Sequence, residues 1–77
     1  MTTLYREVNG RTRYYRIRIY LTLFGEYLLI RECGGVDNKK ATGQQQSYFF
    51  SLGETVSVVK QIITLKRKKG YNLAIPK

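Results

Sequence analysis

The chain has 77 residues, of which 43% are hydrophobic and 25% are charged, and this composition excludes wholesale disorder and predicts one small globular domain. Fourteen Lys and Arg residues stand against five Asp and Glu residues, which gives a formal net charge of +9. So large a positive charge favours polyanionic partners such as nucleic acid, and a surface that is basic only for solubility is the alternative. We place a single domain over residues 1–77, with its core from about 4 to 71 and a short tail over 72–77.

The residues that catalysis and metal binding usually need are scarce in this sequence. It contains no His and one Cys, Cys33, so it offers neither a Cys/His zinc site nor the usual general acid–base residue. The five acidic residues are expected at turns, strand ends and a helix cap, which are ordinary structural places. We therefore expect no enzymatic activity, no cofactor and no small-molecule substrate.

The cysteine content and the apolar segments of the sequence indicate its cellular location. A single cysteine cannot form an internal disulfide, which fits a reducing cytoplasm. The N-terminus lacks the apolar segment of a signal peptide, and no apolar run approaches the roughly 18 residues of a membrane span. We therefore expect a cytoplasmic protein without a membrane partner.

A β-hairpin is predicted near the N-terminus. Residues 4–8 alternate weakly and end at Asn9-Gly10, a pair that tolerates the positive φ angles of a tight hairpin turn. Residues 13–23 then alternate with a period of two, which indicates a strand with one buried face. The positions expected to face the core are Tyr15, Ile17, Ile19, Leu21 and Leu23. The positions expected to face outward are Tyr14, Arg16, Arg18, Tyr20 and Thr22.

Two further strands are predicted downstream. A turn at 24–26 leads to a short apolar strand over 27–31, and residues 46–50 return to strand composition. Between these strands, Cys33-Gly34-Gly35 predicts a tight turn or a bulge, and residues 36–46 predict a long polar loop.

A helix is predicted from Ser51 onward. Ser51 and Glu54 have the spacing of a capping box, and Phe50 is placed to pack onto the first turn. Gly70 suits the left-handed conformation that ends a helix. The expected apolar stripe consists of Leu52, Val56, Val59 and Ile63, widened by Ile62 and Leu65. The expected fold is α+β, an antiparallel sheet of about four strands with one amphipathic helix packed on one face.

Four segments of the chain, taken in order, resemble bacterial stand-alone WGR domains. They are Tyr14-Tyr15-Arg16-Ile17-Arg18-Ile19, Thr22-Leu23-Phe24-Gly25-Glu26-Tyr27, Leu29-Ile30-Arg31-Glu32 and Lys66-Arg67-Lys68-Lys69-Gly70-Tyr71. The resemblance covers the chain from about Tyr5 to Tyr71 and implies the WGR fold. Through the WGR domains of poly(ADP-ribose) polymerases, the resemblance also implies binding at a DNA break. There the signature Trp packs against a sugar at the duplex end, and the signature Arg contributes to interdomain or nucleic-acid contacts.

The signature triplet itself differs in this chain. Where the family has Trp-Gly-Arg, this sequence has Cys33-Gly34-Gly35. A Cys side chain supplies no aromatic stacking surface and a Gly supplies no guanidinium group. The contacts that the resemblance implies at a DNA end are therefore not available from Cys33 and Gly35. We expect Cys33 to be a small, half-buried residue.

Three groups of residues are the candidate contacts to nucleic acid. The first group shares the outward side of one strand and consists of Tyr14, Arg16, Arg18 and Tyr20. Arginine pairs with phosphates and tyrosine stacks on bases, and a solvated sheet face with cross-strand pairs to Glu7 or Glu26 is the alternative. The second group, Lys39 and Lys40, falls in the predicted loop. The third group lies at the end of the predicted helix and consists of Lys66, Arg67, Lys68 and Lys69. The helix dipole alone already favours cations at this position.

Two functional hypotheses are consistent with these patterns. In the first, the chain is a WGR-like module that binds nucleic acid, expected to be double-stranded DNA, through its phosphate backbone and with little sequence specificity. In the second, it is a protein-interaction module, with a protein partner or as a homodimer, that has lost DNA-end recognition. Duplex affinity that falls steeply with salt favours the first, and self-association favours the second.

Overall fold

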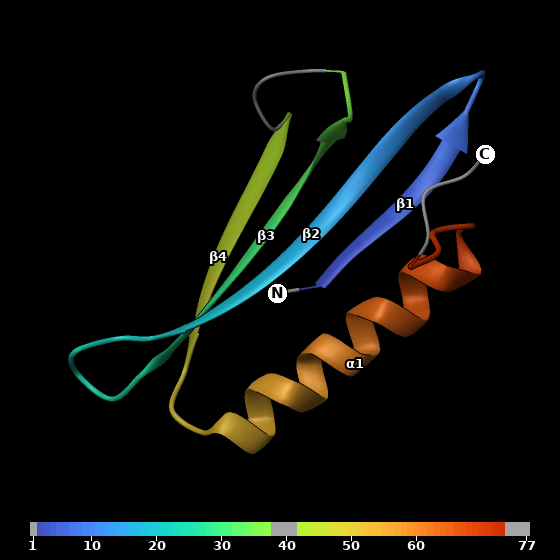
Figure 1. Cartoon of the computed structure of the whole chain (residues 1–77). Coiled ribbons are helices and arrows are strands. Elements are labelled where there is room, and N and C mark those ends of the chain that lie inside the picture. Colours follow the sequence, from blue (N-terminus) through green and yellow to red (C-terminus); the bar gives the residue numbers. More distant parts are fainter. Residues whose placement is uncertain (1, 38–41, 74–77) are drawn as a thin grey trace.

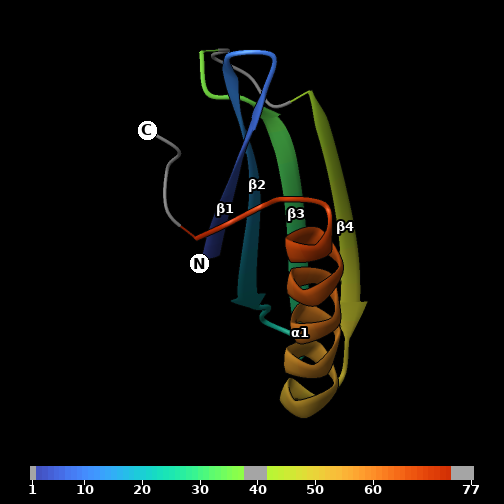
Figure 2. The same ribbon diagram turned by 90° about the vertical axis from the view of Figure 1, so that its right-hand side faces the viewer.

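A computed structural model describes residues 2–37 and 42–73 of the chain. Its elements are β1 (Thr2–Val8), β2 (Arg11–Leu21), β3 (Tyr27–Gly35), β4 (Gly43–Phe49) and α1 (Leu52–Lys68). The strands form one antiparallel sheet in the order β1-β2-β3-β4, and α1 covers one of its two faces (Figures 1 and 2). The predicted α+β fold is confirmed.

The β1–β2 turn and the β2–β3 turn each place residues in the positive-φ region. Asn9 and Gly10 have φ angles of 53° and 78°, which is the pattern of the tight hairpin turn predicted for this pair. In the turn between β2 and β3, Gly25 has a φ of 80°. The hydroxyl oxygen of Thr22 accepts hydrogen bonds from the backbone amides of Phe24 and Glu26, which closes this second turn.

The core lies between the sheet and α1, and the alternation of β2 creates much of it. Tyr15 and Ile17 are buried, as predicted, together with Leu4, Leu29, Ile62 and Tyr71. The same alternation was expected to bury Ile19, Leu21 and Leu23, and this prediction is wrong, because all three are exposed. The reason is length. Eleven strand residues span roughly 37 Å, whereas the 17 residues of α1 span about 25 Å, so the β2–β3 hairpin extends beyond the helix.

The third strand is longer than its apolar run indicated. The structure continues β3 through Cys33-Gly34-Gly35, so the predicted turn or bulge at this triplet is wrong. Gly34 pairs with Tyr14, and a Cβ atom on Gly34 would lie only 3.3 Å from the Tyr14 hydroxyl. Glycine therefore keeps the strand regular here by leaving room for a tyrosine ring. The predicted loop over 36–46 is also too long, because β4 begins at Gly43.

The two ends of α1 lie where they were predicted, although at the N-terminus only the Ser51 half of the predicted capping box is formed. The Oγ atom of Ser51 accepts a hydrogen bond from the backbone amide of Glu54 at 3.4 Å. At the other end, Gly70 has a φ of 99°, and the amide of Tyr71 donates to the carbonyl of Lys66 at 3.0 Å. This arrangement closes the last helical turn and directs the chain back across the sheet. There Asn72 pairs with Tyr5.

The face of α1 that meets the sheet agrees only in part with the predicted stripe, because Ile62 is buried and Val59 and Ile63 pack against the core as predicted, but other members do not. Thr55 and Ile62 are its buried residues, whereas Leu52, Val56 and Leu65 are exposed. Phe50 is 83% exposed, so it does not pack onto the first turn. A threonine can be buried on the sheet-facing side of α1 because its hydroxyl has a hydrogen-bond partner there. The Thr55 hydroxyl donates to the carbonyl of Ser51 at 2.8 Å.

Candidate functional site

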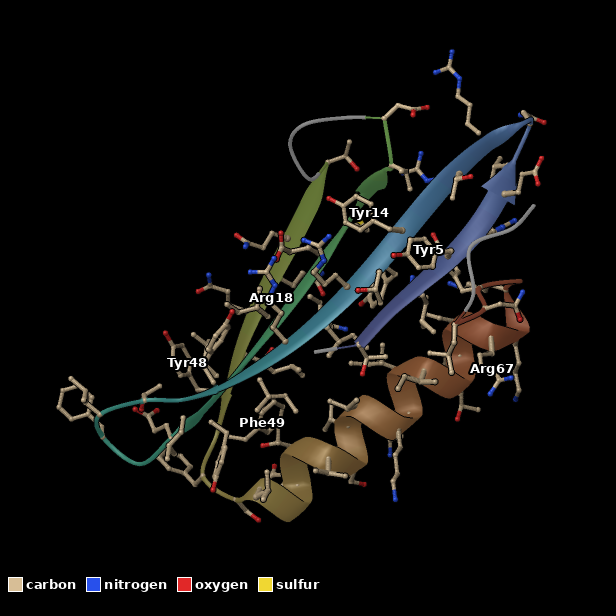
Figure 3. All side chains as sticks on the ribbon, in the orientation of Figure 1. Tyr5, Tyr14, Arg18, Tyr48, Phe49 and Arg67 are labelled. Atoms are coloured by element: carbon tan, nitrogen blue, oxygen red, sulfur yellow. The ribbon has the colours of Figure 1, made fainter. Side chains whose placement is uncertain are left out.

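The helix-free face of the sheet, called the open face from here on, carries the strand residues singled out from the sequence. Because Tyr15 and Ile17 are buried under α1, the alternate positions of β2 point to the other side. These positions are Tyr14, Arg16, Arg18 and Tyr20. Figure 3 shows Arg18 and Tyr48 on the side of the sheet away from α1, whereas Phe49 lies between the sheet and the helix.

Side chains of the open face partly satisfy one another. An Arg18 nitrogen lies 3.3 Å from a Glu32 carboxylate oxygen, so the carboxylate that pairs with this strand belongs to Glu32 and not to Glu7 or Glu26. The neighbouring Tyr20 hydroxyl and the Glu32 carboxylate raise the pKa of Arg18. The guanidinium carbon of Arg16 lies 5.1 Å from the Tyr14 ring centroid. One of the two arginine charges on this face is therefore already balanced by a carboxylate.

The C-terminal end of α1 carries the other described group of candidate residues, Lys66, Arg67, Lys68 and Lys69. The last three of these side chains are exposed, but Lys66 turns toward the sheet. Its Nζ atom lies 4.4 Å from the Tyr15 ring centroid and 5.6 Å from that of Tyr71. Burial lowers the pKa of Lys66, and the nearby cations Lys69 and Arg31 lower it further. The helix end is thus a charged cluster with one inward-facing member.

Two arginines that the sequence analysis left aside lie beside this helix end. The guanidinium carbon of Arg6 lies 5.9 Å from the Tyr71 ring centroid. Arg31 projects from the helix side of β3, because its partner across the sheet is the buried Ile17. A signal for both was present in the sequence. Each stands two residues beyond a buried leucine, Leu4 or Leu29, and a strand returns to the same face every second residue.

We call these six residues the helix-end cluster: Arg6, Arg31, Lys66, Arg67, Lys68 and Lys69. They come from β1, β3 and α1 and lie on the helix side of the sheet. Within the part of the chain that the structure describes, Arg18–Glu32 is the only ion pair, so no carboxylate there pairs with the cluster. The structure therefore divides the predicted contact residues between two surfaces on opposite sides of the sheet.

The remaining candidates are placed as follows. Cys33 is half-buried and packs against the core, which confirms the expectation for this residue. Gly34 is buried next to Tyr14, and Gly35 is the last residue of β3. Lys39 and Lys40 lie outside the described residues.

Neither a metal site nor a membrane span stands out in the described ranges. Residues 2–37 and 42–73 contain no group of three or more His, Cys, Asp or Glu side chains that could hold a metal ion. No helix within these ranges is long and apolar enough to cross a membrane. Comparison with protein-family models, with curated proteins and with solved structures finds no match.

Proposed function

We propose that the chain is a WGR-like module that binds nucleic acid, in particular double-stranded DNA, through the phosphate backbone and with little sequence specificity. One observation carries the proposal. The helix-end cluster gathers six cations from three elements, and no carboxylate among the described residues balances them. Duplex DNA presents about one negative charge per 1.7 Å of its axis, so a cluster of this kind can neutralise several phosphates at once.

The exposed members of the cluster suit contacts to phosphates more than to base edges. Arg67, Lys68 and Lys69 extend from the last helical turn into solvent on long, flexible side chains. Contacts of this type fix the position of a protein on a duplex but carry no sequence information. They also depend on neither Cys33 nor Gly35, so the proposal does not require the missing Trp and Arg of the signature.

The open face is the secondary contact surface in this proposal. Tyr20 and Tyr48 expose roughly half of their surface there, and tyrosine rings can stack on sugars and bases. Its charge is lower than that of the helix-end cluster, because Arg18 is paired with Glu32. We therefore assign most of the binding free energy to the helix end.

A salt titration of duplex binding tests the proposal. We expect the affinity of the full chain for a labelled duplex, measured by fluorescence anisotropy, to fall about 100-fold between roughly 50 and 200 mM salt, as for about four neutralised phosphates. Duplexes of unrelated sequence should bind equally well, because the contacts are to the backbone. Absence of binding at about 50 mM salt contradicts the proposal.

A second candidate function has its own observation. Large apolar side chains are exposed at the β2–β3 turn and at the adjacent β4–α1 connection, and we call this group the apolar tip: Leu21, Leu23, Phe24, Phe50 and Leu52. Leu23 is fully exposed and Phe24 is 88% exposed. An exposed apolar cluster of this kind marks a protein interface more often than an idle surface. The second candidate is therefore an interaction module for a protein partner or for a second copy of this chain.

A further inference from the structure

A hollow of about 430 Å³ lies between the C-terminal half of α1 and the helix side of β3 and β4. Its wall includes Arg31, Cys33 and Gln45 from the sheet and Leu65, Lys66 and Lys69 from the helix. A volume of this size lies within the range of about 300–1,000 Å³ that is usual for small-ligand sites.

The charged side chains that line the hollow, among the described residues, are all cations. Lys66 and Lys69 stand three residues apart on α1, and Arg31 faces them from β3. No carboxylate is among the lining residues that the structure describes. The contact with the Tyr15 ring at 4.4 Å holds the Lys66 ammonium in place without neutralising its charge. The fold therefore brings three like charges together, which is unfavourable unless an anion joins them.

The hydrogen-bonding groups of Arg31 are incompletely used. One terminal nitrogen of its guanidinium donates to the side-chain oxygen of Gln45. Its Nε atom is buried and has no hydrogen-bond partner among the described residues. A guanidinium carries five N–H donors, and a buried donor without an acceptor is unfavourable. The Nε atom of Arg31 therefore has a donor that no described residue accepts. Arg16 and Arg18 on the open face share this property, but Arg31 lines a hollow together with two further cations.

We propose that this hollow binds a phosphate group, with Arg31 donating to its oxygens and Lys66 and Lys69 balancing its charge. The guanidinium fork matches the oxygens of a phosphate, and the two ammonium groups supply charge from the opposite wall. The proposal rests on the proposed function in one respect, because the hollow lies within the helix-end cluster. The phosphate could come from a nucleic-acid backbone or from a free phosphate monoester, and the experiment separates these two sources.

Titration of inorganic phosphate into the ¹⁵N-labelled full chain tests the site directly. We expect saturable shifts of the Arg31 Nε–H and Lys66 Nζ signals, no comparable shift at Lys60, and no such response to chloride at matched ionic strength. Arg31→Met should weaken phosphate binding tenfold or more, since charge-assisted hydrogen bonds are lost. Lys60→Met, on the same helix but outside the hollow, is the matched control and should bind like the wild type.

A second variant keeps the test decisive if Arg31→Met fails to fold. Lys69 is exposed and lines the hollow from the end of α1, so Lys69→Met should fold normally and weaken phosphate binding severalfold. An unshifted Arg31 signal throughout the titration overturns the proposal, as does a chloride response of equal size. Unchanged binding by both Arg31→Met and Lys69→Met also overturns it.

Competition with duplex DNA identifies the source of the phosphate. Displacement of inorganic phosphate by a duplex supports the site with a backbone phosphate as its ligand. Simultaneous binding of both supports the site with a phosphate monoester as its ligand. Duplex binding without any phosphate response at Arg31 overturns the proposed phosphate site and leaves the proposed function standing. A phosphate response without duplex binding overturns the proposed function and leaves the phosphate site standing.

Discussion

Lys66 shows how one side chain contributes both to packing and to charge. It stands four residues after the buried Ile62, which places it on the sheet side of α1. Its ammonium lies over the rings of Tyr15 and Tyr71, between the core and the hollow. The sequence analysis treated residues 66–69 as one group of candidate contacts, and helical geometry is what separates Lys66 from the other three.

The lowered pKa of Lys66 predicts a difference in alkaline stability. Its pKa is lower in the folded chain than in the unfolded chain, so between the two values the unfolded chain binds more protons and stability rises with pH. The wild type should therefore gain free energy of unfolding relative to Lys66→Met as the pH approaches the ordinary lysine pKa from below. Urea unfolding of both proteins at neutral and alkaline pH measures this. A parallel pH dependence contradicts it.

Residues whose role depends on a distant partner were the hardest to predict. Gly34 looked like part of a turn because glycine is disfavoured within strands. Its reason for being glycine is Tyr14, twenty residues earlier, whose ring occupies the space next to it. Arg31 was missed although it shares a strand face with Leu29, because the continuous apolar run before it did not show that this face is the buried one.

At the scale of elements, the signals for turns and helix ends were mostly reliable, whereas side-chain hydrophobicity predicted the buried positions only in part. The turn at Asn9-Gly10, the cap at Ser51 and the stop at Gly70 each depend on a few adjacent residues, and all three are confirmed. The buried stripe of α1 was right at Ile62, Val59 and Ile63 but wrong at Val56, which is exposed while the neighbouring, hydrogen-bonded Thr55 is buried.

The two glycines of the helix region provide a matched pair of substitutions. Gly70→Ala should destabilise the fold by about 1 kcal/mol or more, because alanine is strained at a φ of 99°. Gly53→Ala should instead stabilise it by about 0.5–1 kcal/mol, because Gly53 lies inside α1 and an added Cβ would meet nothing closer than 3.7 Å. Chemical unfolding of both variants checks the opposite signs. Equal shifts of the two variants would contradict the assigned roles.

At the scale of the whole molecule, the charged and apolar surfaces are separated along the helix. The apolar tip lies at the start of α1 and the helix-end cluster at its end, about 25 Å apart for a helix of 17 residues. The sequence predicted a sheet with one covered face. It could not predict this separation, because strand lengths relative to the helix decide which side chains remain uncovered.

The separation allows self-association to be tested without disturbing the charged surface. If the apolar tip joins two copies, sedimentation velocity should show a concentration-dependent dimer. The double substitution Leu23→Ser with Phe24→Ser should weaken the dimer about tenfold or more through lost apolar contact. Leu73→Ser, at an exposed leucine outside the tip, is the control and should leave association unchanged. A wild type that stays monomeric at all concentrations removes the homodimer from consideration.

The dependence of duplex affinity on salt, compared between surface variants, tests the central claim most directly. For Arg67→Gln with Lys68→Gln, the slope of log affinity against log salt should become shallower by about 1.8, or 0.9 for each lost phosphate contact. Lys60→Gln should leave the slope unchanged, and Arg16→Gln with Arg18→Gln should reduce it less, because Arg18 is paired with Glu32. An unchanged slope in the helix-end variant, or a larger loss in the open-face variant, would contradict the assignment of the phosphate contacts to the helix-end cluster.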